Sequence, residues 1–288
     1  MNPQPAPTCF RHPDRVTGLA CTRCGRAACP ECLRPAAVGQ HCVDCLRQGS
    51  ADVRPVQTVA GAQVATRPTP YVTYALIAIN VAVFAFTAAQ ARSVADNQLS
   101  RLFFDWMLVP PLVAHGEWGR VIGAGFLHYG PLHLAVNMFA LYILGRDTEM
   151  VLGRGRYIAV YLASLLGGSA AVMWLAQDSA TAGASGAIYG LFGAMTVILL
   201  RLRQSPTQML VLIAINLLIS VALPGISLWG HLGGLAAGTL AAGGILFLPQ
   251  WMRVTTRESA SRVGWVAVTG VVLLTVLLIA AAAVTLAS

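Results

Sequence analysis

Seven apolar stretches, separated by short polar segments, follow one another from Tyr71 to the end of this 288-residue chain. Crossing about 30 Å of hydrocarbon takes roughly 20 apolar residues in a helix, which satisfies its own backbone hydrogen bonds in lipid. The stretches cover about 71–89, 121–145, 157–176, 183–200, 208–222, 228–248 and 263–286. Only 10% of the residues are charged, against about 25% in soluble domains. The chain is therefore predicted to be an all-α polytopic membrane protein, and a soluble globular enzyme is excluded.

The placement of arginine predicts the orientation of these spans. All 19 basic residues are Arg. With a cytoplasmic N-terminus, 16 of them lie in inside segments, and Arg92, Arg101 and Arg120 lie outside. The positive-inside rule therefore favours the N-terminus in the cytoplasm and the C-terminus outside. The fourth and fifth stretches are short for membrane spans. A chain with six spans would have its C-terminus inside, but residues 263–286 are long and uncharged and favour seven spans.

All seven Cys residues lie in a polar head before the first span. With one His they form four pairs separated by two residues: Cys9 and His12, Cys21 and Cys24, Cys29 and Cys32, and Cys42 and Cys45. Eight such ligands are enough for two closed tetrahedral zinc sites, which are structural rather than catalytic. A disulfide framework is the alternative, but it needs an oxidising compartment. His41 could replace Cys42, which we favour because it keeps the two-residue spacing.

Over about 40 residues, this head resembles a B-box-type zinc finger. The resemblance implies two cross-braced ligand sets: Cys9, His12, Cys29 and Cys32 at one metal, and Cys21, Cys24, Cys42 and Cys45 at the other. A head this small builds little hydrophobic core, so metal binding would drive its folding. We expect two structural zinc ions and a structural or protein-binding role, with a cytosolic protein as partner. Scattered Arg residues and the lack of Lys or aromatic support disfavour nucleic acid as a partner.

Polar side chains in the apolar stretches are the candidates for chemistry, because ionisable groups inside a membrane span are costly and usually functional. They are His128, His133, Asn137, Ser185, Tyr189 and His231. His133 and Asn137 are four residues apart and share one helix face. Ser185 and Tyr189 have the same spacing.

Residues typical of helix starts and of close helix contacts indicate where several of these side chains lie. Pro131 fits the first turn of the second helix, which leaves His128 in or near the preceding loop. Ser185 lies in a Gly-Ala-Ser-Gly segment at a predicted helix start, where free backbone N–H groups favour negative charge. Gly234 and Gly238, beside His231, form a small-residue face suited to close helix contact. The fourth stretch offers a matching face at Gly186, Gly190 and Ala194.

Together these motifs resemble those of the rhomboid intramembrane serine proteases, over about 71–250. The similar motifs are His128-x4-His133-x3-Asn137 in the second span, Gly183-Ala184-Ser185-Gly186 with Tyr189 in the fourth, and His231-Leu232-Gly233-Gly234 in the sixth. The first loop, Glu117-Trp118-Gly119-Arg120, resembles a family signature, although Gly119 stands where the family has Trp. The head and the seventh span lie outside the six-helix core.

The resemblance implies a Ser–His dyad without an acidic third member and without a catalytic cofactor. Ser185 would attack the scissile carbonyl, and His231 would take its proton and return it to the leaving amine. Supporting roles are implied for His133, Asn137, Tyr189 and Gly183. The side chains of the first two, with the Ser185 N–H, would stabilise the oxyanion, and Tyr189 would orient His231. Structural roles are expected for His128, Arg120 and Glu149.

The resemblance also implies the substrates and the location. We expect membrane proteins whose transmembrane helix unwinds locally, with small residues at the cleavage site. The protein is predicted to be a multi-pass protein of the plasma membrane, surrounded by the lipid bilayer, with its site open to the external side. One alternative is a non-catalytic rhomboid-like protein that binds membrane clients, which is disfavoured because Ser185 and His231 are both present. The other is a transporter or proton channel that uses the histidines.

Four segments are predicted along the chain. They are a B-box-like zinc-binding domain over 1–48, a flexible linker over 49–70, a rhomboid protease core of six transmembrane helices over 71–250, and a cytoplasmic loop with a seventh transmembrane helix over 251–288.

Overall fold

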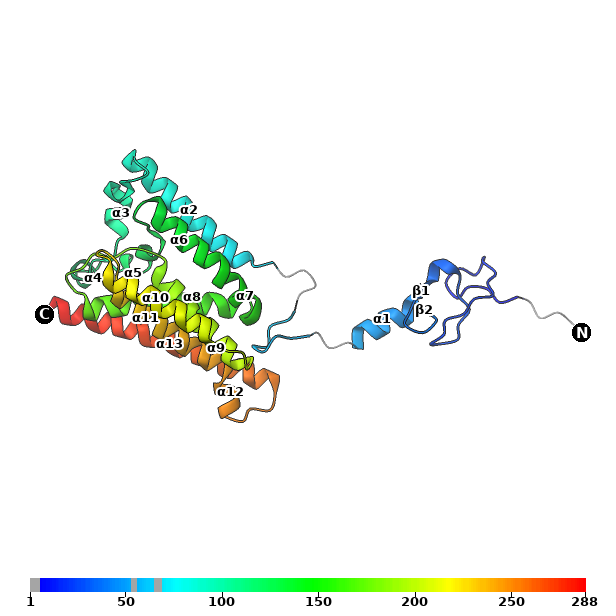
Figure 1. The fold of residues 1–288 in the computed structure, drawn as a ribbon. Helices are drawn as coiled ribbons and strands as arrows, with labels where there is room; N and C mark the ends of the chain where they lie inside the picture. Colours follow the sequence, from blue (N-terminus) through cyan, green and yellow to red (C-terminus); the bar gives the residue numbers. More distant parts are fainter. Residues whose placement is uncertain (1–5, 53–55, 65–68) are drawn as a thin grey trace, which may run out of the picture. The chain divides into compact units, whose positions relative to one another are not determined.

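A computed structural model describes residues 6–52, 56–64 and 69–288. The chain divides into two compact units, Met1–Val56 and Gln57–Ser288 (Figure 1). The predicted linker over 49–70 is described only in part, because residues 53–55 and 65–68 lie outside the described residues. The four predicted segment boundaries therefore remain predictions.

The first unit has little regular structure. It contains the 3-10 turn η1 (Pro30–Cys32), the antiparallel strands β1 (Leu33–Pro35) and β2 (Gln40–Cys42), and helix α1 (Val43–Asp52). Its buried interior consists of six cysteines together with Ala28 and Leu33. Such a core removes little apolar surface from water and therefore contributes little hydrophobic stabilisation.

Residues 57–63 form a compact turn that belongs to the second unit and packs on its helices. Gln57 and Gln63 pair across it, and Thr58 Oγ1 donates a 2.6 Å hydrogen bond to the Val151 carbonyl. The Arg156 guanidinium donates to the carbonyl of Ala60, which is itself buried. This part of the predicted linker is thus fixed to the helical unit rather than extended.

The second unit is helical, and within residues 69–288 it has seven long helical segments, as predicted. They are α2 (Tyr71–Ala91), a continuous rod made of α6 (Gly130–Ala140), the π-helical turn η4 (Leu141–Gly145) and α7 (Arg146–Leu152), then α8 (Arg154–Leu175), α9 (Ser185–Arg201), α10 (Thr207–Ala222), α11 (Leu228–Leu246) and α13 (Arg257–Ala287). Shorter helices connect them: η2 (Asn97–Leu99), α3 (Arg101–Trp106), α4 (Pro110–Ala114), α5 (Arg120–Gly123), η3 (Ala124–Phe126) and α12 (Leu248–Trp251).

The second predicted stretch, 121–145, differs most from its helix. Its first residues belong to α5 and η3, and the long helix begins only at Gly130. Gly130 has a φ of +70°, a conformation that favours glycine, and Pro131 follows in the first turn. His128 therefore lies in the preceding loop, as predicted. The helix continues past Gly145 to Leu152. The predicted stretch ended too early because hydropathy marks only the apolar part of a helix and misses its charged end.

Three helices of the described residues, α2, α8 and α13, are long and apolar enough to cross a membrane by length and composition. α9 and α10 are apolar but have only 17 and 16 residues, in agreement with the short fourth and fifth stretches. The chain is thus a helical membrane protein with several candidate spans.

Glycines bring α8, α9 and α11 together at the centre of this unit, with α13 alongside α8 and α11 (Figure 1). A Cβ atom at Gly234 would collide with the Gly186 carbonyl, and one at Gly238 would collide with the Gly190 carbonyl. Without side chains, the two backbones touch directly. The predicted contact between the small-residue faces of the fourth and sixth stretches is confirmed at these glycines.

Candidate functional site

Ser185 and His231 lie at two neighbouring helix starts. Ser185 is the first residue of α9, and His231 lies in the first turn of α11, which Ser227 caps by accepting from the Gly230 N–H. Ser185 Oγ is 2.8 Å from His231 Nε2. His231 is buried and Ser185 is half-buried. The glycine contacts between α9 and α11 therefore place a hydroxyl against an imidazole inside the helical unit.

Two further side chains hold the His231 imidazole. Tyr189, one turn after Ser185, stacks on it with ring centroids 4.0 Å apart and an angle of 11° between the ring planes. Ser220 of α10 lies 2.7 Å from the second ring nitrogen, Nδ1. The sequence pattern does not single out Ser220, because a lone serine in an apolar helix gives no signal of its own. Only its rarity as a polar residue within 208–222 could have drawn attention to it.

His133 presents a proton donor beside Ser185. The Tyr129 backbone N–H donates to His133 Nδ1 over 3.1 Å, so a neutral His133 carries its proton on Nε2. A Cβ atom at Gly183 would lie 3.2 Å from that nitrogen and 3.5 Å from Ser185 Oγ. Gly183 also has a φ of +143°. Both the space and the backbone conformation at this position therefore require glycine.

Asn137 lies one turn along the same helix. Its Nδ2 donates a 2.9 Å hydrogen bond to the His133 carbonyl, which uses one of its two N–H protons. The residue is buried. The spacing of His133 and Asn137 thus puts both on one face of α6, as predicted.

A cavity of about 50 Å³ opens beside Ser185 and His231. Most of its wall comes from small residues, among them Gly125, Gly168, Gly183, Ser169 and Ala182. A water needs roughly 10–15 Å³ of such space. The cavity is therefore large enough for a few waters or for a small side chain.

Backbone hydrogen bonds fix the segment that leads into α9. Leu108 and Thr181 exchange two N–H···O bonds of 2.9 Å. The Gly183 N–H donates to the Ala124 carbonyl, also over 2.9 Å. The loop between α2 and α6 thus supports the approach to Ser185.

Arg120 organises that loop. It is 3% exposed, and its guanidinium donates to the Phe104 carbonyl at 2.6 Å, to the Met107 carbonyl at 3.0 Å and to the Glu117 carboxylate. A Cβ atom at Gly119 would meet nothing within 4 Å. Gly119 is exposed, so a side chain at this position would extend into open space and not into the packed loop.

Within the described residues, His128 and Glu149 make no hydrogen bond to the Ser185 hydroxyl. His128 is fully buried, with its ring 5.2 Å from that of His133, and neither of its ring nitrogens has a hydrogen-bond partner within the described part of the chain. Glu149 accepts from the backbone N–H groups of Val72 and Thr73, at 3.1 and 2.8 Å. It thereby caps the start of α2, where a negative charge is favourable.

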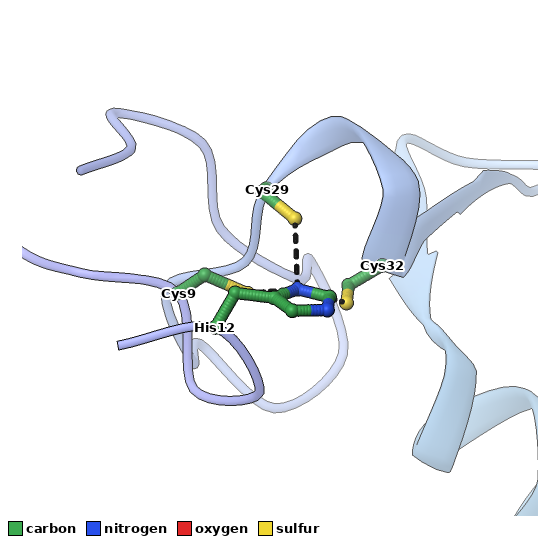
Figure 2. A group of neighbouring side chains, drawn as sticks. All are labelled: Cys9, His12, Cys29 and Cys32. Carbon is green, nitrogen blue, oxygen red and sulfur yellow. Dashed lines mark hydrogen bonds between the residues drawn. The ribbon is translucent and has the colours of Figure 1, made fainter. Parts of the chain in front are cut away.

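The head holds two clusters of potential metal ligands. One consists of Cys9, His12, Cys29 and Cys32 (Figure 2), and the other of Cys21, Cys24, Cys42 and Cys45. Within each cluster the ligand atoms lie within 4.8 Å of one another. These are the two sets that the B-box resemblance implies, with Cys42 rather than His41 in the second.

The distances within the clusters fit tetrahedral zinc. Bonds of about 2.3 Å to sulfur and 2.0 Å to nitrogen would put sulfur and nitrogen about 3.5 Å apart, and two sulfurs about 3.8 Å apart. His12 Nδ1 lies 3.4 Å from the sulfurs of both Cys29 and Cys32. The sulfurs of Cys24 and Cys42 are 3.8 Å apart, and all seven cysteines are free thiols. The disulfide framework is therefore not formed, and both clusters are suited to a metal ion.

The thiols of the clusters do not ionise equally on their own. Burial opposes ionisation of Cys9 and Cys21, but backbone N–H donors outweigh it and lower the pKa of each thiol to about 6. Burial, strengthened by neighbouring cysteines, raises the pKa of Cys32 to about 11 and that of Cys45 to about 12. A bound dication would stabilise all of these thiolates together. Each cluster is therefore better suited to hold a metal ion than to remain a group of thiols without one.

The fold and the site together define a helical membrane protein in which a serine and a histidine meet across two glycine-packed helices. The sequence model of the rhomboid domain matches residues 115–249. The putative rhomboid protease YdcA of Bacillus subtilis is 35% identical over 134 residues, which are 44% of this chain and 67% of that relative. The chain belongs to the rhomboid family.

Two other relatives match a smaller share of their own length. Rhomboid protease GluP of Bacillus subtilis is 40% identical over 136 residues, which are 46% of this chain and 27% of GluP. The mitochondrial RHOMBOID-like protein 6 of Arabidopsis thaliana is 39% identical over 153 residues, 51% of this chain and 48% of the relative. The chain thus spans less than half the length of these two relatives.

Proposed function

We propose that this chain is an intramembrane serine endopeptidase that cleaves the transmembrane segments of membrane proteins with Ser185 and His231. The observation that carries the proposal is the 2.8 Å contact between Ser185 Oγ and His231 Nε2, because a nucleophile and its base must lie within hydrogen-bond reach. The names of the relatives, which include rhomboid proteases, support the same class.

In the first half of the reaction, Ser185 Oγ attacks the carbonyl carbon of the scissile peptide bond. A C–O bond forms, the carbonyl oxygen takes the electron pair of the double bond, and the hydroxyl proton passes to His231 Nε2. When the tetrahedral intermediate collapses, the C–N bond breaks and His231 gives this proton to the leaving amine. One fragment leaves with a free amine, and the other stays as an ester of Ser185.

In the second half, water attacks the acyl carbon and gives a proton to His231 Nε2. Collapse of this intermediate breaks the ester bond, and Ser185 Oγ takes the proton back. The second fragment leaves as a carboxylic acid, and no cofactor is consumed. The cavity beside Ser185, with room for a few waters, supports this step within an apolar protein.

We assign the oxyanion to three donors: His133 Nε2–H, Asn137 Nδ2–H and the backbone N–H of Ser185. The hydrogen bond from Tyr129 to His133 Nδ1 supports the first assignment, because it leaves the proton on Nε2. The N–H groups in the first turn of α9 have no partner within the helix and favour negative charge. Gly183 leaves the space between them open, and the stacked Tyr189 fixes the plane of the His231 ring.

The substrates and the location are part of the proposal. The small cavity favours small residues at the cleavage site. We propose a plasma-membrane location, and the arginine distribution favours a cytoplasmic N-terminus with a site open to the external side. Reporter fusions after residues 48 and 288 test this orientation, and opposite sides of the membrane are expected for the two ends.

For the head, we propose a B-box-like domain that binds two structural zinc ions and a cytosolic protein partner. The two four-ligand clusters support this assignment. Zinc there would cross-brace the chain and would take no part in peptide hydrolysis, because closed four-ligand sites leave no open position. Metal analysis of the purified chain is expected to give two zinc ions per molecule, and none would refute the assignment.

Cleavage of a single-span membrane substrate by the wild type, Ser185→Ala and His231→Ala tests the catalytic proposal. Product is expected from the wild type alone. Equal product from all three would overturn it. No product from any of them, together with capture of the intact substrate, would favour the non-catalytic, client-binding alternative.

A further inference from the structure

Ser220 is one of the few residues that tie α10 to the rest of the protein. All residues of this helix are described, and only Ile213 and Ser220 among them are buried. Ser220 Oγ has three polar neighbours: the Asn216 carbonyl at 2.8 Å, His231 Nδ1 at 2.7 Å and the Tyr189 hydroxyl at 3.2 Å. In each of these three contacts, one of the two groups must donate a proton and the other must accept it.

The number of protons available determines the direction of all three hydrogen bonds. A serine hydroxyl has a single proton, and the Asn216 carbonyl can only accept, so Ser220 donates there. The lone pairs of Ser220 Oγ then face His231 and Tyr189, and both of these groups donate to it. A neutral His231 therefore carries its proton on Nδ1, and the lone pair of its Nε2 faces the Ser185 hydroxyl.

We propose that Ser220 is a positioning residue of the catalytic base, because it fixes the His231 tautomer that can take the proton of Ser185. The proposal rests on the proposed function of Ser185 and His231. When Nε2 takes the proton, the imidazole becomes a cation, and its Nδ1–H still needs an acceptor. Ser220 supplies a neutral acceptor at the place where a Ser-His-Asp triad has a carboxylate. Its own donation to Asn216 strengthens it as an acceptor.

The chain offers matched controls for this role. Ser220→Thr keeps the hydroxyl, whereas Ser220→Ala removes it. Ile213→Ala removes the other buried contact of α10 without touching His231. Tyr189→Phe removes one donor to Ser220 and keeps the stacked ring. A loss caused only by loosening of α10 would therefore appear in Ile213→Ala as well.

The first measurement is the cleavage rate of the full chain, reconstituted in liposomes, on a single-span substrate. Ser220→Ala is expected to lower kcat about 10²-fold, less than the roughly 10⁴-fold loss on removing an ionised orienting group, and to leave KM nearly unchanged. Ser220→Thr is expected to stay within a few-fold of the wild type. Unchanged kcat in Ser220→Ala, or an equal loss of kcat in Ile213→Ala, would overturn the proposal.

The second measurement reads the tautomer directly, by ¹⁵N NMR of the full chain labelled at histidine, with His231→Ala used to assign the signal. The wild type and Ser220→Thr are expected to show His231 protonated at Nδ1, and Ser220→Ala to gain the Nε2-protonated form. An identical tautomer in all three variants would refute the role of Ser220. If the wild type does not cleave at all, the proposed function fails, while this signal still decides whether Ser220 sets the tautomer.

Discussion

The two units of this chain reach a defined structure by different means. In the head, the buried side chains are mostly cysteines, and two sets of four ligand atoms converge on two points. In the helical unit, glycines remove the side chains between α9 and α11, so that backbone packs on backbone. The head therefore has two sites suited to a metal ion, whereas the packing of the helical unit relies on positions that lack side chains. Each feature can be tested without disturbing the other unit.

The largest effect is expected from removing metal from the head. Zinc in small structural sites contributes roughly 10–16 kcal/mol of apparent binding free energy, and little apolar burial remains without it. Chelation of the full chain is expected to release two zinc ions and to let trypsin cut at the Arg residues of the head, while the thermal unfolding of the helical unit stays unchanged. The same tryptic pattern with and without chelator would contradict this.

The sequence supplies a matched pair for the same test. Cys42→Ser removes a ligand and is expected to lower the zinc content from two ions to one. His41→Ala alters the neighbouring residue, which lies outside both clusters, and is expected to keep two. The opposite result would make His41 the eighth ligand.

The next largest effect is expected in the helical unit, from Ser185→Ala. Loss of the nucleophile should reduce cleavage by at least about 10⁴-fold, because no other hydroxyl is placed 2.8 Å from His231 Nε2 in the described residues. The zinc content and the thermal unfolding of this variant should equal those of the wild type. A variant that lost zinc as well would show that the two units are not independent.

A smaller loss is expected from His133→Ala. Removing one oxyanion donor typically lowers kcat by about 10²–10³-fold, with a minor effect on KM. His115→Ala serves as the control, because His115 caps the end of the short helix α4 and is exposed. Equal kcat in His133→Ala and the wild type would remove His133 from the oxyanion site.

The sequence predicted those features that repeat or that stand out by residue type. The seven helices followed from hydropathy, and the eight potential metal ligands followed from paired spacing. The division of these ligands into two sets and the pairing of Ser185 with His231 followed from the resemblances to the B-box and to the rhomboid proteases. Ser220 was missed because its partner, Nδ1 of His231, lies on another helix, and no local pattern encodes that meeting. The turn over 57–63 was missed because its fixing contacts, such as that of Thr58 with Val151, are far apart in sequence.

The smallest of these effects tests the glycine packing itself. Gly238→Val places a side chain against the Gly190 backbone, and overpacking of this kind typically costs about 1–3 kcal/mol. Gly243→Val adds the same side chain to the same helix, where a Cβ atom would meet nothing within 4 Å. Thermal unfolding in detergent is expected to shift down by about 2–4 °C per kcal/mol for Gly238→Val, and hardly at all for Gly243→Val. Equal shifts in the two variants would mean that the contact between Gly238 and the Gly190 backbone does not limit the stability of the helical unit. In that case the meeting of Ser185 and His231 would need another explanation than the close approach of α9 and α11.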